Sequence, residues 1–209
     1  MTASVDVLIQ DQEQQEQPQD GRTLRRLNSY DRAVDALLDL IESGIASPTA
    51  QQIAEKSGIS VRTVFRLTED IESLHAAAIE RQIQRTAHLY VKIPASGSLG
   101  ARIRALVDNR ASVFEAIAPT RRVADRLAEG SPQITAGLAF HHQILQMQVA
   151  ELFDRELSRI SRVRRPDALN AIDVAAGWET WDQLRRIQGL SITSSGRVVR
   201  LLIEGVLGK

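Results

Sequence analysis

The sequence predicts an all-α protein, and three observations support this. No segment alternates apolar and polar residues with the two-residue period of a strand. Aromatic residues make up only 4% of the chain, whereas Ala, Leu, Ile and Arg are abundant, which is typical of helical proteins. Gly and Pro are concentrated at a few places, where they separate segments in which apolar residues recur at helical spacing.

Residues 1–21 are expected to form a disordered tail. They contain the run QDQEQQEQPQDG, which is acidic and Gln-rich and has no apolar face to bury. Three arginines follow directly: Arg22, Arg25 and Arg26. Two interpretations of them stay open: an arm that reaches the backbone or minor groove of DNA, or a solvated extension of the tail.

A helix is predicted from Asn28 or Ser29 to Gly44. Its apolar residues recur at i, i+3, i+4, i+7, i+8 and i+11, so they form one stripe that can face a core. The stripe consists of Tyr30, Ala33, Val34, Leu37, Leu38 and Ile41. Gly44 ends the pattern.

The segment 49–74 predicts two short helices joined by a tight turn. Thr49 is a suitable N-cap, and Gln52 completes a capping box with it. Gly58 lies where the chain must reverse, and glycine tolerates the left-handed backbone needed there. Ser60 is placed to cap a second helix whose Val64 points inward. This order favours a helix-turn-helix that binds DNA; the alternative is an ordinary αα-hairpin.

Further helices are predicted along the rest of the chain. A helix is expected over residues 71–91, before the Pro- and Gly-containing stretch 94–100. Pro119 is expected to separate two helices, and Gly189 to end another. The later predicted helices are residues 99–117, 120–128, 132–157, 168–188 and 193–207.

The segment from Thr49 to Leu74 resembles the N-terminal domain of the TetR family of bacterial transcriptional repressors. The resemblance rests on T-x-x-x-I-A, S-G-I-S and T-V-F-R, followed by a helix that contains E-x-L. The positions that carry it are Thr49, Ile53, Ala54, Ser57, Gly58, Ile59, Ser60, Thr63, Val64, Phe65, Glu72 and Leu74.

The resemblance implies a helix-turn-helix DNA-binding domain over residues 22–68 and a helical effector-binding and dimerisation domain over 69–209. The second short helix would enter the major groove, with Arg62 against a base and Arg66 and Thr49 against phosphate. The residues expected to bind the DNA operator are Thr49, Ser60, Val61, Arg62, Thr63, Arg66, Arg25 and Arg26.

The chain departs from the family at several phosphate-contacting positions. The family usually has Tyr, His or Lys side chains where this chain has Phe65, Leu67 and Ile71. Phosphate contacts supply much of the affinity for DNA. Two alternatives follow: Arg62, Arg66 and the N-terminal arginines compensate, or the chain is a helical interaction or adaptor protein that has lost strong DNA binding.

Family members act as homodimers whose DNA binding is relieved by a small molecule. The last two predicted helices are too apolar for one free face, so we expect the dimer interface at Trp178, Trp181, Leu184, Val198 and Leu202. The alternative is that these helices are internal core. The unknown inducer is expected to contact Phe114, Phe140, His141 and Met147 in the middle helices.

Several classes of function are not expected. The chain has no Cys, and its adjacent His141 and His142 point about 100° apart on a helix, so no metal site or cofactor is predicted. No nucleophile elbow or phosphate-binding loop is present, so an enzyme is not expected. No apolar run is long enough for a membrane span. The formal net charge is +0. We therefore expect a soluble, cytoplasmic protein without a membrane partner.

Overall fold

The computed structural model describes residues 21–67 and 71–208, and these are helical without any strand, which confirms the all-α prediction. Three short turns of other helix types interrupt the α-helices: η2 (Ala87–Leu89), η3 (Ala128–Gly130) and the π-helical η4 (Gln183–Ile187). The α-helices are α2 (Gly21–Glu42), α3 (Ala50–Ser57), α4 (Val61–Leu67), α5 (Ile71–Thr86), α6 (Leu99–Leu127), α7 (Pro132–Leu152), α8 (Asp154–Leu157), α9 (Arg165–Ala175), α10 (Trp178–Asp182) and α11 (Ile192–Val206).

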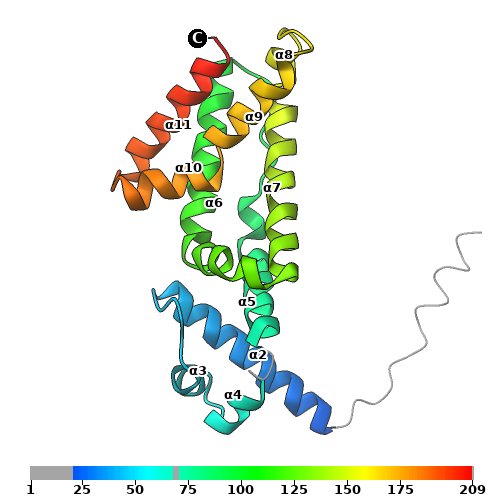
Figure 1. The fold of residues 1–209 in the computed structure, drawn as a ribbon, viewed down its shortest axis with the longest axis vertical. Helices are drawn as coiled ribbons and strands as arrows, with labels where there is room; N and C mark the ends of the chain where they lie inside the picture. Colours follow the sequence, from blue (N-terminus) through cyan, green and yellow to red (C-terminus); the bar gives the residue numbers. More distant parts are fainter. Residues whose placement is uncertain (1–20, 68–70, 209) are drawn as a thin grey trace, which may run out of the picture.

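The described residues form two apolar cores along the long axis of the molecule. The smaller core lies between α2, α3, α4 and α5 and contains Leu37, Ile53 and Val64. The larger core lies between α6, α7, α9, α10 and α11 and contains Phe114 and Trp181. Figure 1 shows these groups at opposite ends of the molecule, with α5 between them. The expected domain boundary between residues 68 and 69 lies outside the described residues.

The first described helix follows the predicted stripe but begins earlier than predicted. Val34, Leu37 and Leu38 of α2 are at most 1% exposed, as expected for residues that face a core. The helix begins at Gly21, however, and not at Asn28 or Ser29. Its first two turns lack a buried face, because Leu24 is half-exposed. Apolar periodicity therefore could not reveal this extension.

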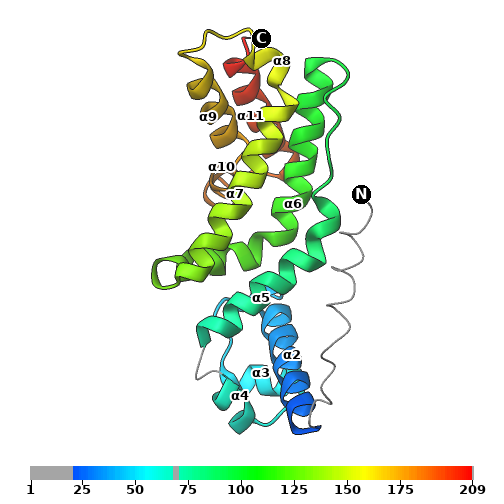
Figure 2. The same ribbon diagram turned by 90° about the vertical axis from the view of Figure 1, so that its right-hand side faces the viewer.

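The prediction that Pro119 separates two helices is wrong. A single helix, α6, runs through it from Leu99 to Leu127. Apolar residues are buried on both sides of the proline, so packing outweighs the missing backbone hydrogen bond, which costs ~3 kcal/mol. Gln82 of α5 donates from Nε2 to the Ala116 carbonyl at 3.0 Å, one turn before Pro119. The helix bends in its second half, as Figure 2 shows.

The predicted helix over residues 132–157 is interrupted at Phe153. α7 ends at Leu152, and the separate turn α8 follows. Arg102 of α6 explains the interruption: its Nη1 donates to the Leu152 carbonyl at 2.6 Å, and its guanidinium lies 5.8 Å from the ring centroid of the buried Phe153. A cation at a helix C-terminus donates hydrogen bonds to the last carbonyl groups and interacts favourably with the negative end of the helix dipole.

The predicted helix over residues 168–188 is divided among three elements, α9, α10 and the π-helical η4. α9 ends at Ala175, and α10 begins at Trp178 after Gly177, whose backbone is extended with φ −84° and ψ 165°. A side chain at Gly177 would place its Cβ 3.1 Å from the Asp173 carbonyl oxygen. The chain turns tightly here, and the turn brings the indole ring of Trp178 against Phe114 in an edge arrangement.

Candidate functional site

The paired helices α3 and α4 have the local structure that the sequence predicts. The Thr49 side chain accepts from the Gln52 backbone nitrogen at 3.2 Å, and Gln52 accepts from the Thr49 nitrogen at 2.9 Å, which confirms the capping box. Gly58 has φ +66°, in the left-handed region that favours glycine. The Ser60 hydroxyl accepts from the Thr63 nitrogen at 3.1 Å, so it caps α4 as predicted.

The helix α4 has one buried face and one open face. Val64 is fully buried against the smaller core, whereas Arg62 and Arg66 are exposed. Neither guanidinium makes a hydrogen bond or ion pair with the described part of the chain. Val61 and Thr63 are half-buried at the start of the helix. Figure 1 shows α4 at the end of the molecule farthest from α8 and α11.

Two of the hydroxyls expected to bind DNA already have partners within the protein. The Thr49 hydroxyl accepts the capping bond and also donates to Gln52 Oε1 at 3.1 Å. The Ser60 hydroxyl lies 2.8 Å from that of Thr63 as well as capping α4. These hydroxyls fix the helix starts, so the open donors of this surface are the arginines.

The arginines after the predicted tail belong to a helix, and both interpretations of them, an arm that reaches DNA or a solvated extension, stay open. Arg25 and Arg26 lie in the first turns of α2 and are exposed. The Arg25 carbonyl accepts from the Ser29 hydroxyl at 2.9 Å, as in a continuous helix. Figures 1 and 2 both place the start of α2 and the helix α4 at the same end of the molecule. The rest of the predicted tail, residues 1–20, lies outside the described residues.

Salt bridges hold α5 to α2. Arg81 contacts Asp35 at 2.8 Å and Asp31 at 3.0 Å. Arg85 contacts Asp35 at 3.2 Å and Asp39 at 3.1 Å. The three aspartates recur every four residues on one face of α2, so α2 and α5 are connected over two helical turns. A displacement of α5 would therefore move α2 with it.

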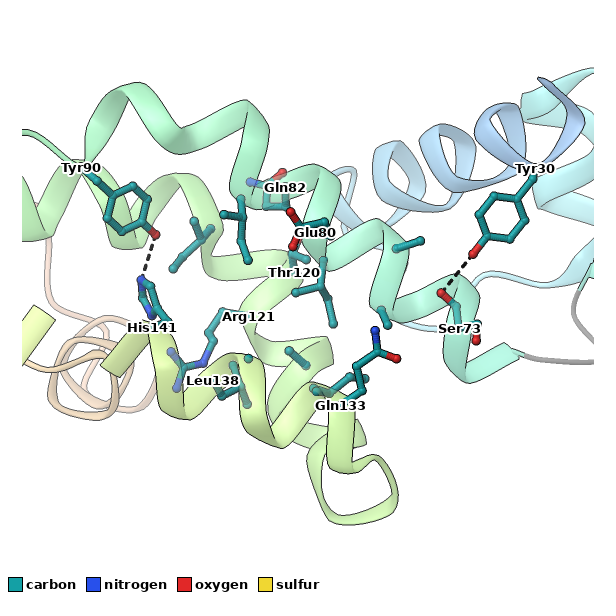
Figure 3. Close-up of a pocket in the computed structure, with 18 residues that line it drawn as sticks. Tyr30, Ser73, Glu80, Gln82, Tyr90, Thr120, Arg121, Gln133, Leu138 and His141 are labelled. Carbon is teal, nitrogen blue, oxygen red and sulfur yellow. Dashed lines mark hydrogen bonds between the residues drawn. The ribbon is translucent and has the colours of Figure 1, made fainter. Parts of the chain in front are cut away.

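The opposite side of α5 forms one wall of a cavity of about 410 Å³. α6 and α7 supply the other walls, and Tyr30 of α2 lies at its edge (Figure 3). Its apolar lining includes Ala76, Ala77, Ile79, Ile83, Ile117, Ala124, Ile134 and Leu138. A volume of this size accommodates a drug-sized ligand.

Polar side chains lie at two places on the cavity wall. At one end, the Tyr90 hydroxyl is 2.9 Å from His141 Nε2, as Figure 3 shows. Along the wall, Gln82 Oε1 and Thr120 Oγ1 are buried and have no hydrogen-bond partner. Buried polar atoms are normally paired, because an unpaired one costs stability. Both atoms are covered by surrounding atoms, so this cost falls on the stability of the folded chain.

Of the four residues expected to contact a ligand, only His141 lines this cavity. Phe114 is fully buried in the larger core, against Trp178 and Trp181. Phe140 is 65% exposed and Met147 58% exposed on the outer face of α7. This corrects their expected position: the aromatic and thioether side chains were chosen by type, and residue type does not reveal which face of a mixed helix is inward.

Four residues that line the cavity were not predicted from the sequence: Gln82, Tyr90, Thr120 and Arg121. They come from α5, the segment after η2, and α6, which are distant in sequence. The spacing Gln82, then Thr86, both buried on a helix with an apolar face, is a weak signal of a polar inward position. No local pattern connects Tyr90 to His141, because their contact joins residues 51 positions apart.

Burial and the nearby Arg121 and Arg110 lower the pKa of His141 to about 4. The unfolded chain binds this proton below about pH 6.5, whereas the folded chain binds it only near pH 4, so stability falls as the pH drops between these values. At pH 5 we expect the unfolding free energy to be lower than at pH 7, and this histidine alone should account for at most about 2 kcal/mol of the difference. Urea unfolding at pH 7 and pH 5 measures this.

The His141→Phe variant should lose correspondingly less stability over the same range. His88→Phe, at an exposed position, should behave as the wild type. An identical pH dependence in the wild type and His141→Phe would show that this imidazole is not held neutral by the fold.

The residues expected at a dimer interface divide into two groups. Trp178, Trp181 and Leu184 are at most 4% exposed inside the chain, so their expected place on the surface is wrong. Their apolar character is explained by the larger core. Leu202 is 45% exposed, and Val198 is half-buried, on the outer side of α11.

The described residues provide neither a cluster of metal ligands nor a membrane-spanning helix. Within residues 21–67 and 71–208, no group of three or more His, Asp or Glu side chains could hold a metal ion. No helix in the same ranges is both long and apolar enough to cross a membrane. No protein-family model, curated protein or solved structure matches the chain.

Proposed function

We propose that this protein is a homodimeric DNA-binding transcriptional regulator of the TetR type, most simply a repressor, released from its operator by a small molecule. It would act on DNA in the cytoplasm. α3 and α4 serve as the helix-turn-helix, and α4 enters the major groove. The exposed guanidiniums of Arg62 and Arg66 on α4, which no described residue pairs, carry this proposal. Such groups match guanine and phosphate.

The cavity gives the regulator a route for control. Its wall, α5, is tied by salt bridges to α2, which packs against α3. A ligand that displaces α5 would move the DNA-reading helices and change their separation across a dimer. A coupling of about 1–3 kcal/mol between cavity and DNA is enough for a switch.

Dimerisation is supported by α11, which is apolar on two sides. Ser195, Val199 and Ile203 are buried against the protein's own core. A second stripe at Val198, Leu201 and Leu202 faces outward, and Leu201 is 69% exposed. Figure 1 shows α11 at the edge of the larger group of helices. We propose that this stripe packs against the same stripe of a second copy.

The Leu202→Glu variant should weaken dimerisation at least about 100-fold, because two charges would be buried in an apolar contact. Sedimentation velocity over a concentration series measures this. Leu24→Glu, at a similarly exposed leucine on α2, should leave the dimer unchanged. A wild type that stays monomeric at high micromolar concentration would contradict the proposed interface.

A gel-shift assay tests the proposed function. The full chain is titrated against DNA from upstream of its own gene, with unrelated DNA of equal length as competitor. We expect preferential binding that weakens as salt rises, since phosphate contacts release counterions. Absence of any binding at about 50 mM salt, where such contacts are strong, would overturn the proposal.

The alternative is a helical adaptor on the same fold that no longer binds DNA strongly. One observation favours it: Phe65, between the two arginines of α4, is 61% exposed, and an exposed aromatic side chain is typical of protein contacts. Under this alternative the gel shift is negative, and Phe65→Ala abolishes binding to a protein partner.

A further inference from the structure

The end of the cavity near His141 is bordered by a guanidinium with a spare donor. Arg121 lines the cavity and has an 11% exposed side chain. Its Nε donates to Asp125 at 2.8 Å and its Nη2 to Glu179 at 3.2 Å, while its Nη1 bonds to nothing in the described chain. Figure 3 shows the guanidinium beside His141.

The two carboxylates that pair with Arg121 lie on its solvent side. Asp125 is 38% exposed and Glu179 is 77% exposed. Water and salt screen exposed charges, so these carboxylates offset the cation less effectively than buried ones would. Arg121 therefore keeps positive charge beside the cavity that it lines, and its guanidinium also lies over the Trp178 ring, with Cζ 5.6 Å from the ring centroid.

A second cation lies behind the same end of the cavity. Arg110 is 2% exposed and donates to neutral acceptors, Gln148 Oε1 at 2.6 Å, the Leu145 carbonyl at 3.0 Å and Asn109 Oδ1 at 3.5 Å. The Asp173 carboxylate, which does not line the cavity, acts on it electrostatically. Arg110 forms no salt bridge with a described residue. Arg110 and Arg121 both lower the pKa of His141, which reports a positive potential at this position. The His141 imidazole is neutral and does not add to this potential. Among the described residues that line the cavity, no carboxylate contacts His141 to offset it.

The remainder of the cavity suits a hydrocarbon. Its wall along α5 and α7 consists mainly of Ala, Ile and Leu side chains. Glu80 also lies on the α5 wall, but it is exposed and contacts Gln84. Negative charge on a ligand is therefore favoured at the Arg121 end and disfavoured near Glu80.

We propose that the cavity binds an amphipathic organic acid, with its carboxylate at the Arg121, Tyr90 and His141 end and its apolar body along α5. As the effector of a DNA-binding regulator it rests on the function proposed above. The binding step itself does not depend on DNA. A charge-assisted hydrogen bond from Arg121 Nη1 and the field of Arg110 select the anion over a neutral molecule of equal shape.

Isothermal titration calorimetry of the full chain without DNA tests this inference. The probes are decanoate and 4-phenylbutyrate, each compared with its own amide, which keeps the size and removes the charge. We expect saturable binding of at least one acid at one per chain, about tenfold or more tighter than its amide. Equal affinity of acid and amide, or no saturable binding of either acid, overturns the inference.

Variants assign the selectivity to Arg121. Arg121→Gln should bring acid and amide within about threefold of each other, whereas Arg122→Gln should retain the difference. Arg122 is the matched control: it neighbours Arg121, pairs with Asp182 and does not line the cavity. Leu138→Trp should fill the cavity and weaken every probe. If Arg121→Gln does not fold, the wild-type comparison of acid with amide still decides.

The two proposals fail separately. Selective acid binding with no gel shift would keep this inference and remove the regulator. A gel shift without acid selectivity would keep the regulator and remove the organic acid as its ligand.

Discussion

Replacing Arg62 with alanine is expected to weaken operator binding by about 5- to 150-fold, which corresponds to a bidentate guanine contact of ~1–3 kcal/mol. Arg62 lies in the first turn of α4, exposed and unpaired, while Val64 anchors the helix in the core. The loss should be largest on the preferred sequence and small on unrelated DNA. Fluorescence anisotropy with labelled operator DNA measures both.

Two further arginine variants distinguish a base contact from sequence-independent attraction to the DNA backbone. Arg66→Ala should weaken binding to all sequences alike and reduce the salt slope by about 1, as expected for one phosphate contact. Arg104→Ala, exposed on α6 and far along the chain from α4, should have no effect. Equal losses from Arg62→Ala on operator and unrelated DNA would contradict base reading by this residue.

Replacing Trp181 with alanine should lower the unfolding free energy by about 3–5 kcal/mol, the usual cost of removing a buried large aromatic side chain. Trp181 is 2% exposed, packs 6.3 Å from the Phe114 ring between centroids, and donates from Nε1 to Glu115 Oε1 at 2.9 Å. Removal leaves a cavity and an unpaired acceptor. Urea denaturation followed by circular dichroism measures the loss.

The Trp181→Ala variant also shows whether this side chain belongs to the internal core or to the dimer interface. Leu202→Glu should change association while leaving the unfolding free energy of the separated chain nearly unchanged. Trp181→Ala should destabilise the chain even where it is monomeric. If Trp181→Ala altered only dimerisation, the side chain would belong to the interface that the sequence analysis expected, and not to the internal core.

Local chemistry was predicted well from the sequence. The capping box at Thr49, the left-handed Gly58 and the cap at Ser60 each depend on residues within a few positions. The buried stripe of α2 follows from spacing alone. Such features need no knowledge of distant segments, so the starts of α3 and α4 and the inward face of α2 could be derived.

Features that depend on distant contacts could not be derived. Pro119 continues a helix because the packing of buried apolar residues on both sides offsets its missing hydrogen bond. α7 stops at Leu152 because Arg102, fifty residues earlier, takes its carbonyl. Apolar helices that serve as core or as interface look alike in sequence, since both need the same side chains. The cavity was missed for a related reason: its polar residues converge from three helices.

Footprinting tests the central claim, that α4 is a DNA-reading helix presented twice by a dimer. Hydroxyl-radical cleavage of the shifted operator fragment should show two protected segments on one side of the duplex, centred about 34–36 Å or a multiple of that apart. At a protein concentration near the wild-type Kd, both should weaken with Arg62→Ala and persist with Arg104→Ala. Uniform cleavage with wild-type protein, or protection that survives Arg62→Ala unchanged, would contradict it.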